Sequence, residues 1–418
     1  MLSWFMATPA PALTFRDVLR RKPFRSLWLA QFVSIFGDFL ALFGVISLIT
    51  FRLHGSAVGV TLVSLAFVLP MALVSPPAGV LVDHWNVKRV MIASDLIRGL
   101  LVLPLVFVTS VPQICVIFAA LSTVSSFFGP AQMVTLRLIV PPEGLLAANG
   151  LMSQAFYTVR LLSPALAGGL VALLSEKACF YLDSASFFFS AVMLSTLAIA
   201  RPSHDREKTL RALTNDFIAG NRFIFTHRAL AFVFTAMAMA MFVLSAFSPL
   251  ISIYIRDSLS AGVIWYGIMS SMVGVGMILG TQLITRLARN ISKQLMVLYG
   301  LLGLGMGAAL LGLFHNIPVA TLSTLTIGFT VAFVLVPAQT LSQQETPHEL
   351  MGRVSSSFMS LIALSQVMGL LLSGYLAQVF GTRKLFMVCG LVLALLAGGG
   401  YLLLREQSRV IADQALEG

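Results

Sequence analysis

The sequence predicts an all-α membrane protein whose twelve transmembrane helices form two six-helix bundles. Hydrophobic residues make up 58% of the 418 residues and charged ones only 10%, whereas a soluble domain carries about 25% charged residues. Mean hydropathy is +0.94. Apolar runs of about 18 to 25 residues recur along the chain, each long enough to cross a hydrocarbon core about 30 Å thick. A phrase of Pro-Ala-Gln followed by Pro, Glu and Leu occurs twice.

The apolar runs define twelve expected spans and one long polar connector. The spans are 24–51, 57–82, 90–109, 112–136, 150–174, 178–200, 229–254, 262–285, 294–314, 317–341, 354–379 and 384–404. We therefore expect a lead (1–23), an N-terminal bundle (24–200), a linker (201–228), a C-terminal bundle (229–404) and a tail (405–418).

The doubled phrase lies in the fourth span of each set. It contains Pro130 in the first half and Pro337 in the second, 207 residues further on. Two copies with the same topology are expected to be related by an axis along the membrane normal, with the substrate site between them near the midplane. Pro130 and Pro337 should then superpose.

Lysine and arginine residues predict the orientation. With the N-terminus inside, twenty of the 27 fall in cytoplasmic segments and five in outer loops, as the positive-inside rule requires. Both termini are then cytoplasmic, and the protein is expected to be a monomer in the inner (plasma) membrane, surrounded by lipid. The net charge of +11 indicates topology here, and no nucleic-acid partner is expected.

Enzyme and channel functions have little support in the sequence. The cysteines Cys115, Cys179 and Cys389 fall in or beside different spans, and no cluster has metal-ligand spacing. No nucleophile motif or nucleotide-binding glycine loop is present, so no cofactor is expected. A channel would build its pore from rings of repeated polar groups, but the charges inside the membrane are not repeated in the second half.

Five charged residues inside the predicted spans all belong to the first half: Asp38, Asp95, Arg98, Arg160 and Asp183. Each costs about 3 kcal/mol near the bilayer centre, so each needs a reason. Asp95 and Arg98 are three residues apart and share a helix face. They predict a structural ion pair near the inner end of span three, with a role in coupling as the alternative. Asp183, near the outer end of span six, predicts a structural hydrogen bond.

Asp38 and Arg160 are the candidates for coupling. About fourteen residues of span one precede Asp38, which at 1.5 Å each places it roughly 20 Å deep. Arg160 lies near the midplane of span five, whose sequence has no acid to neutralise it. We hypothesise that Asp38 carries a proton and that Arg160 sets its affinity. The alternative is a buried pair that only specifies packing.

The fifth span also carries Ser163-Pro164-Ala165-Leu166-Ala167-Gly168-Gly169. Pro164 is expected to bend the helix, because proline removes a backbone donor. Gly168 and Gly169 should allow another backbone to approach closely.

The stretch "AGVLVDHWNVKRVMI" (78–92) contains Gly79, Asp83, Lys88 and Arg89. It resembles the loop between spans two and three of the major facilitator superfamily, usually G-x-x-x-D-R-x-G-R-K/R. The resemblance implies the major facilitator fold and a gating loop at these residues. His84, Asn86 and Val87 depart from the pattern.

Further phrases resemble one branch of that superfamily. They are "SIFGDFL", "ASDLIRGLL", "VRLLSPALAGG", "FYLDSASFF" and "QETPHELMGRVSS". They are similar to macrolide-efflux proteins and enterobactin exporters. The resemblance implies a secondary transporter that exchanges protons for small amphiphilic substrates, such as drugs, macrolides or siderophores, by alternating access. A lysophospholipid transporter of the same superfamily is the alternative, because it shares the phrase "ANGLM".

Overall fold

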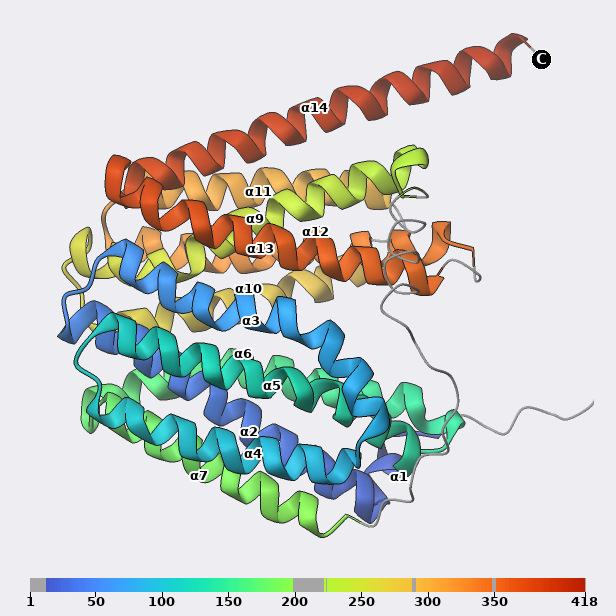
Figure 1. The fold of residues 1–418 in the computed structure, drawn as a ribbon. Coiled ribbons are helices and arrows are strands. Elements are labelled where there is room, and N and C mark those ends of the chain that lie inside the picture. Colours follow the sequence, from blue (N-terminus) through green and yellow to red (C-terminus); the bar gives the residue numbers. More distant parts are fainter. Residues whose placement is uncertain (1–12, 198–221, 223, 288–290, 348–350, 418) are drawn as a thin grey trace, which may run out of the picture.

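The computed structural model describes residues 13–197, 222, 224–287, 291–347 and 351–417. Within these residues, twelve helices are long and apolar enough to cross a membrane. The bundle is drawn with its helices horizontal in Figure 1, where the N-terminal half (blue to green) lies below the C-terminal half (yellow to red).

The helices of the two halves have the following bounds. The first half contains a short helix α1 (Phe15–Arg20), then α2 (Lys22–Ser47), α3 (Ala57–His84), α4 (Val87–Val102), α5 (Val111–Ile139), α6 (Leu145–Leu173) and α7 (Glu176–Ser195). The second contains α9 (Arg228–Asp257), α10 (Val263–Leu287), α11 (Lys293–Leu313), α12 (Ile317–Glu345), α13 (Met351–Phe380) and α14 (Thr382–Glu417). A π-helical turn (Leu48–Arg52) extends α2, and a 3₁₀ turn (Leu103–Phe107) extends α4.

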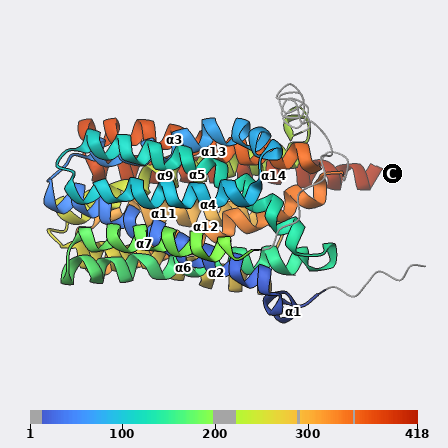
Figure 2. The same cartoon turned by 60° about the horizontal axis from the view of Figure 1, so that its bottom comes forward.

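Helix pairing repeats between the halves. In the first half α2 packs on α6 and α7, α3 on α5, and α4 on α5 and α7; the second half repeats this with α9 on α13 and α14, α10 on α12, and α11 on α12 and α14. Between the halves, α6 packs on α10 and its counterpart α13 packs on α3. Helices α3 and α13 lie side by side in both ribbon views (Figures 1 and 2). The expected pair of pseudo-symmetric six-helix bundles is confirmed.

The repeated prolines occupy equivalent places in that arrangement. Pro130 lies inside α5, the fourth span of its half, and Pro337 lies inside α12, the fourth span of the other. Both helices have 29 residues. The duplicated phrase therefore marks the same helix in each bundle.

The third span differs from its sequence prediction, and this moves two charges. Its helix begins at Val87, where the Asn86 side chain accepts a hydrogen bond from the Arg89 N–H at 3.1 Å, and the span continues to Phe107. Asp95 and Arg98 consequently lie in the middle of a 21-residue span. The prediction that they sit near its inner end is wrong.

The two ends of the bundle differ in how the halves meet. We call the end with Lys22 and Ser195 the connector end and the end with Arg52 and Arg256 the far end; they lie right and left in Figure 1. Toward the far end one hydrophobic core combines both halves, including Ile49, Val60 and Leu250. Toward the connector end, separate cores form around Phe24 and Met91 in one half, and around Phe234 and Phe358 in the other.

Candidate functional site

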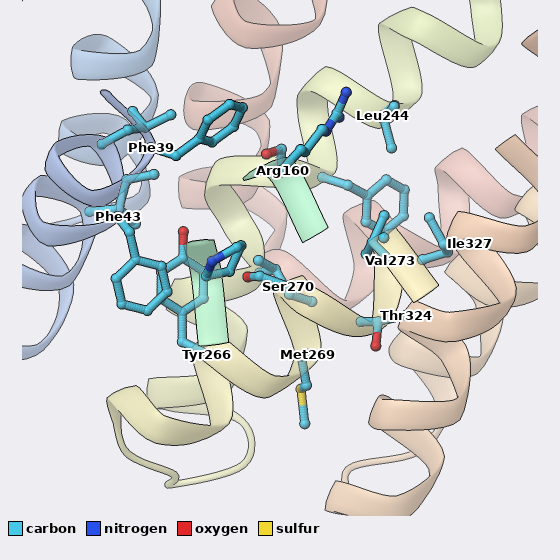
Figure 3. Close-up of a pocket in the computed structure, with 17 residues that line it drawn as sticks. Phe39, Phe43, Arg160, Leu244, Tyr266, Met269, Ser270, Val273, Thr324 and Ile327 are labelled. Carbon is cyan, nitrogen blue, oxygen red and sulfur yellow. The ribbon is translucent and has the colours of Figure 1, made fainter. Parts of the chain in front are cut away.

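A cavity of about 290 Å³ lies between the two halves. From the first half it is lined by α2 and α6, and from the second by α9, α10 and α12. The lining residues are Phe39, Leu42, Phe43, Ile46, Arg160, Pro164, Leu244, Phe247, Ser248, Ile251, Tyr266, Met269, Ser270, Val273, Gly274, Thr324 and Ile327. Figure 3 shows these side chains converging from helices of both halves. The walls are mostly aromatic and aliphatic, with a few hydroxyl groups.

Aromatic stacking closes the cavity toward the far end. The rings of Phe43 on α2 and Tyr266 on α10 stack with their centroids 4.5 Å apart and an interplanar angle of 20°. The ring centroid of Phe51 lies 6.5 Å from that of Tyr266. Tyr266 is only 5% exposed, so this stack forms a tight floor.

Hydrogen bonds seal the far end beyond this floor. The Thr50 hydroxyl donates to the Ser252 hydroxyl at 3.0 Å, joining α2's π-helical extension to α9. Arg256 Nη1 donates to the carbonyls of Thr50 and Gly55 at 2.8 and 2.9 Å. These hydrogen bonds connect the first half to the second. The cavity is therefore closed toward the far end in this conformation.

Arg160 is the charged residue of the cavity wall. It lies in the middle of the fifth span, as expected, and its side chain is exposed. In Figure 3 it stands beside Leu244, on the side of the cavity opposite Tyr266 and Met269. Among the described residues, no hydrogen bond, ion pair or ring contact is found for its guanidinium. The cavity thus presents one unneutralised positive charge.

The other four intramembrane charges form a cluster inside the N-terminal bundle. Arg98 on α4 forms an ion pair with Asp95 on the same helix and lies 4.0 Å from the Asp38 carboxylate on α2. Its guanidinium also stacks over the rings of Phe128 at 4.7 Å and Phe187 at 4.3 Å. The Arg98 and Asp95 side chains are 5% and 0% exposed, whereas Asp38 is 39% exposed. Asp38 is therefore the accessible member.

Asp183 on α7 completes this cluster. It is 1% exposed and lies within electrostatic range of Asp38 and Arg98. A methyl group added to Gly37 of α2 would come within 2.5 Å of its carboxylate, so Gly37 makes room for the acid. Ser186 lies one turn on, 3.5 Å from the same oxygen. Asp183 was expected to make a structural hydrogen bond near the outer end of its span, but it sits close to the middle, next to Asp38.

The partner of Asp38 therefore differs from the sequence hypothesis. Asp38 meets Arg98, and no ion pair joins it to Arg160. The physical reason is the rotation of the helices: Phe39 and Phe43 of α2 line the cavity that Arg160 enters, whereas the Asp38 carboxylate turns toward α4. One helix thus separates a buried acidic cluster from an isolated cation in the cavity.

The structure describes the surroundings of three of the four residues predicted to form a gating loop between the second and third spans. Lys88 Nζ donates to the carbonyls of Ser195 and Leu197 at 2.7 and 2.6 Å, which satisfies the C-terminus of α7. A Cβ added to Gly79 of α3 would lie 3.9 Å from the ring of Pro130 on α5. The Arg89 side chain is exposed. Asp83 belongs to α3, but its side chain lies outside the described residues.

Pro164 and Gly168 of the fifth span meet the other half of the molecule. Gly168 lies against Gly267 of α10, with an added Cβ only 3.1 Å from the Gly267 Cα. An added Cβ on Gly267 would in turn lie 2.7 Å from the Pro164 carbonyl oxygen. Gly169 has no such neighbour within 4 Å. Gly168 thus permits the backbone contact between α6 and α10.

Two pseudo-symmetric six-helix bundles with a cavity at their interface are typical of secondary transporters. The chain belongs to the Major Facilitator Superfamily, whose sequence profile matches residues 27–370. It is therefore a multi-pass membrane transporter of this superfamily.

Similar proteins include both uncharacterised and named transporters. An MFS-type transporter of Bacillus subtilis, YfiS, is 30% identical over 90% of this chain and 92% of its own length. Macrolide efflux protein A of Streptococcus pyogenes is 24% identical (90% and 94% covered). The multidrug efflux pump Tap of Mycolicibacterium fortuitum is 25% identical (82% and 86% covered).

Solved structures share the fold at low sequence identity. The nucleoside transporter NupG superposes with a TM-score of 0.71 at 14% identity, over 91% of this chain and 98% of its own. A bacterial homologue of the human lysosomal transporter Spinster, in an inward-facing and unoccupied conformation, gives 0.71 at 14% identity (91% and 97%).

Proposed function

We propose that the protein exports small amphiphilic molecules by alternating access and that proton entry drives the export. The named relatives are a macrolide efflux protein and a multidrug efflux pump, which supports the direction. The cavity walls suit a largely apolar cargo. The distribution of lysine and arginine supports a cytoplasmic connector end, so the closed far end would face outward.

The proposal of proton coupling rests on the cluster formed by Asp38, Asp95, Arg98 and Asp183. Three carboxylates share a single guanidinium in the middle of the membrane. If all were ionised, the cluster would hold an excess of two negative charges in a poorly solvated place, where unpaired charge is strongly unfavourable. Binding protons to the carboxylates reduces that excess. The cluster is therefore suited to take up and release protons.

Asp38 is the member placed to exchange its proton with water. It is 39% exposed, whereas the paired Asp95 is fully buried. It also lies next to Phe39, which lines the cavity. Arginine side chains are effectively always charged in proteins, whereas carboxylates can take up a proton, so we assign Arg98 as the fixed partner and Asp38 as the variable one. A movement of α2 against α4 would change the 4.0 Å separation between Asp38 and Arg98 and with it the proton affinity.

Transport into inside-out vesicles tests this assignment. Protein-containing vesicles receive a pH gradient and a panel of labelled compounds that includes a macrolide, an aryl carboxylate and a lysophospholipid. The parent should concentrate at least one of the first two when the lumen is acidic. Asp38→Asn should lose uphill accumulation, by tenfold or more, and keep downhill exchange of the same compound.

Glu143→Gln is the matched control, since Glu143 is an exposed carboxylate at the connector end. It should behave like the parent. Uphill accumulation by Asp38→Asn at the parental level would remove Asp38 from coupling. If only the lysophospholipid accumulated, the protein would be a lipid transporter and the proposal of drug export would be wrong.

A further inference from the structure

Arg160 is the feature of the cavity that the proposed export cycle does not use. The acidic cluster has its own guanidinium in Arg98, so Arg160 is not needed to balance it. An arginine at this depth in a membrane protein is expensive. Its position in the cavity wall therefore calls for a partner that the described residues do not supply.

No charged residue of the cavity wall neutralises Arg160, so its guanidinium is available to a molecule that enters the cavity. None of the other residues that line the cavity is charged. The nearest intramembrane carboxylate cluster faces α4 and α7 behind α2. Tyr157, one turn earlier on α6, lies within electrostatic range of Arg160 but is not a carboxylate. A molecule in the cavity thus encounters a net positive charge.

The other residues of the cavity wall indicate what the rest of a bound molecule would look like. Phe39, Phe43, Phe247 and Tyr266 supply ring faces, and Met269 supplies a flexible apolar contact. The hydroxyls of Ser248, Ser270 and Thr324 lie among them and offer weak polar contacts. The cavity of about 290 Å³ is at the small end of ligand pockets, which span about 300 to 1,000 Å³. It fits a compact body of one or two fused rings.

We propose that the substrates of this transporter are amphiphilic anions, with Arg160 binding the acidic group and the aromatic wall binding the apolar body. The proposal rests on the proposed transport function and names its substrate class. A guanidinium offers paired N–H donors that match a carboxylate or phosphate and does not lose its charge. In an apolar surrounding this contact is strong because water competes little for it.

Charge selectivity should be measured by binding, with three probes of one shape. Full-length protein in lipid nanodiscs is dialysed against labelled naphthylacetate, its neutral amide naphthylacetamide, and naphthylmethyl-trimethylammonium. Empty nanodiscs correct for partitioning into lipid. The parent should bind the carboxylate at least tenfold more tightly than the amide, a difference of about 1.4 kcal/mol, and bind the ammonium compound least.

Two variants of Arg160 separate charge from packing. Arg160→Gln should bind carboxylate and amide with equal affinity, while Arg160→Lys should keep a preference for the carboxylate. Arg137→Gln, which removes an exposed arginine outside the cavity, should match the parent. Size exclusion and thermal unfolding of each variant confirm that it is folded.

Several results would overturn the proposal. These are equal binding of the carboxylate and amide by the parent, tighter binding of the ammonium probe, or an unchanged carboxylate preference in Arg160→Gln. Equal weakening of all three probes together with a lower unfolding temperature would make Arg160 a packing residue. Binding requires no proton gradient, so a failure of coupled transport leaves this result readable, and the reverse also holds.

Discussion

The two halves repeat one topology but use different side chains at its centre. In the first half, α2, α4 and α7 meet around three carboxylates and a guanidinium. Their counterparts α9, α11 and α14 carry no Asp, Glu, His, Lys or Arg in the interior of their spans. Phe247 of α9 there stacks on Phe386 of α14 with centroids 4.3 Å apart. The same helix contact is electrostatic in one half and aromatic in the other.

Glycine packing shows the converse difference. Where α10 meets α12, an added Cβ on Gly328 would lie 1.9 Å from the Val273 carbonyl oxygen, and one on Gly276 2.1 Å from that of Leu325. In the equivalent pair, α3 and α5, an added Cβ on Gly129 would have no neighbour within 4 Å. One on Gly79 would meet only the Pro130 ring, at 3.9 Å. The contact between α10 and α12 is therefore made backbone against backbone at these glycines, whereas Gly79 and Gly129 do not bring the backbones of α3 and α5 together in this way.

The difference between the two halves suggests that they have different functions in transport. A close-packed half provides a firm apolar wall, since tightly packed helices resist deformation. Under the proposed mechanism, proton binding would change the helix contacts of the half with the buried charges. We infer that coupling resides in the first half and that the second serves mainly as the surface against which it moves.

The largest expected effect comes from removing the guanidinium of the charged half. Arg98→Met should destabilise the protein by about 3 to 5 kcal/mol, because it leaves buried carboxylates without their cation. Thermal unfolding in detergent measures the loss. Arg137→Met is the control at an exposed arginine. Adding Asp95→Asn to Arg98→Met should recover part of the stability, and no recovery would show that Arg98 acts through its stacking on Phe128 and Phe187.

A smaller effect is expected from enlarging a glycine of the packed half. Gly328→Val should cost roughly 1 to 3 kcal/mol, the usual range for overpacking, because its new side chain meets the backbone of α10. Gly129→Val, in the equivalent helix α5, is the matched control. The unfolding temperatures of the two variants test the contrast directly, and equal losses would refute the difference in packing between the halves.

The smallest effect concerns the seal that joins the halves. Thr50→Val removes the hydrogen bond to Ser252, worth about 0.5 to 1.5 kcal/mol, and should raise the population that is open at the far end. A cysteine introduced at Ser248, in a variant without Cys115, Cys179 and Cys389, reports this opening by its labelling rate with an impermeant maleimide. Thr50→Ser keeps the hydroxyl and should label at the parental rate. Equal rates in the two variants would contradict the role of this bond.

The architecture was predictable because membranes limit it so strongly. Each span must have a length of apolar sequence that matches the bilayer, and the Pro-Ala-Gln phrases revealed the repeat. The depth of Asp95 and Arg98 was not predicted, because the apolar run from which it was counted begins at residue 90 whereas α4 begins at Val87. A signal for that start was present, since asparagine at position 86 is a favoured helix N-cap.

The site was less predictable because it depends on how helices face one another. The sequence identified Asp38 and Arg160 as unusual, but their separation by α2 depends on the rotation of that helix. The cavity residues Phe43 and Tyr266, and the seal at Thr50 and Ser252, are ordinary residue types that become informative only when two halves meet. Their roles have no local sequence signature.

The single hydrophobic core at the far end has a consequence for leakage. Opening that end would wet apolar faces of both halves, at about 25 cal/mol for each Å² exposed. At the connector end the cores of the two halves are separate, so closing that end would bury apolar surface that is now apart. A state open at both ends would bury apolar surface between the halves at neither end. We therefore expect it to be the least populated arrangement. Water and ions are thus kept from crossing by the cost of exposing hydrocarbon.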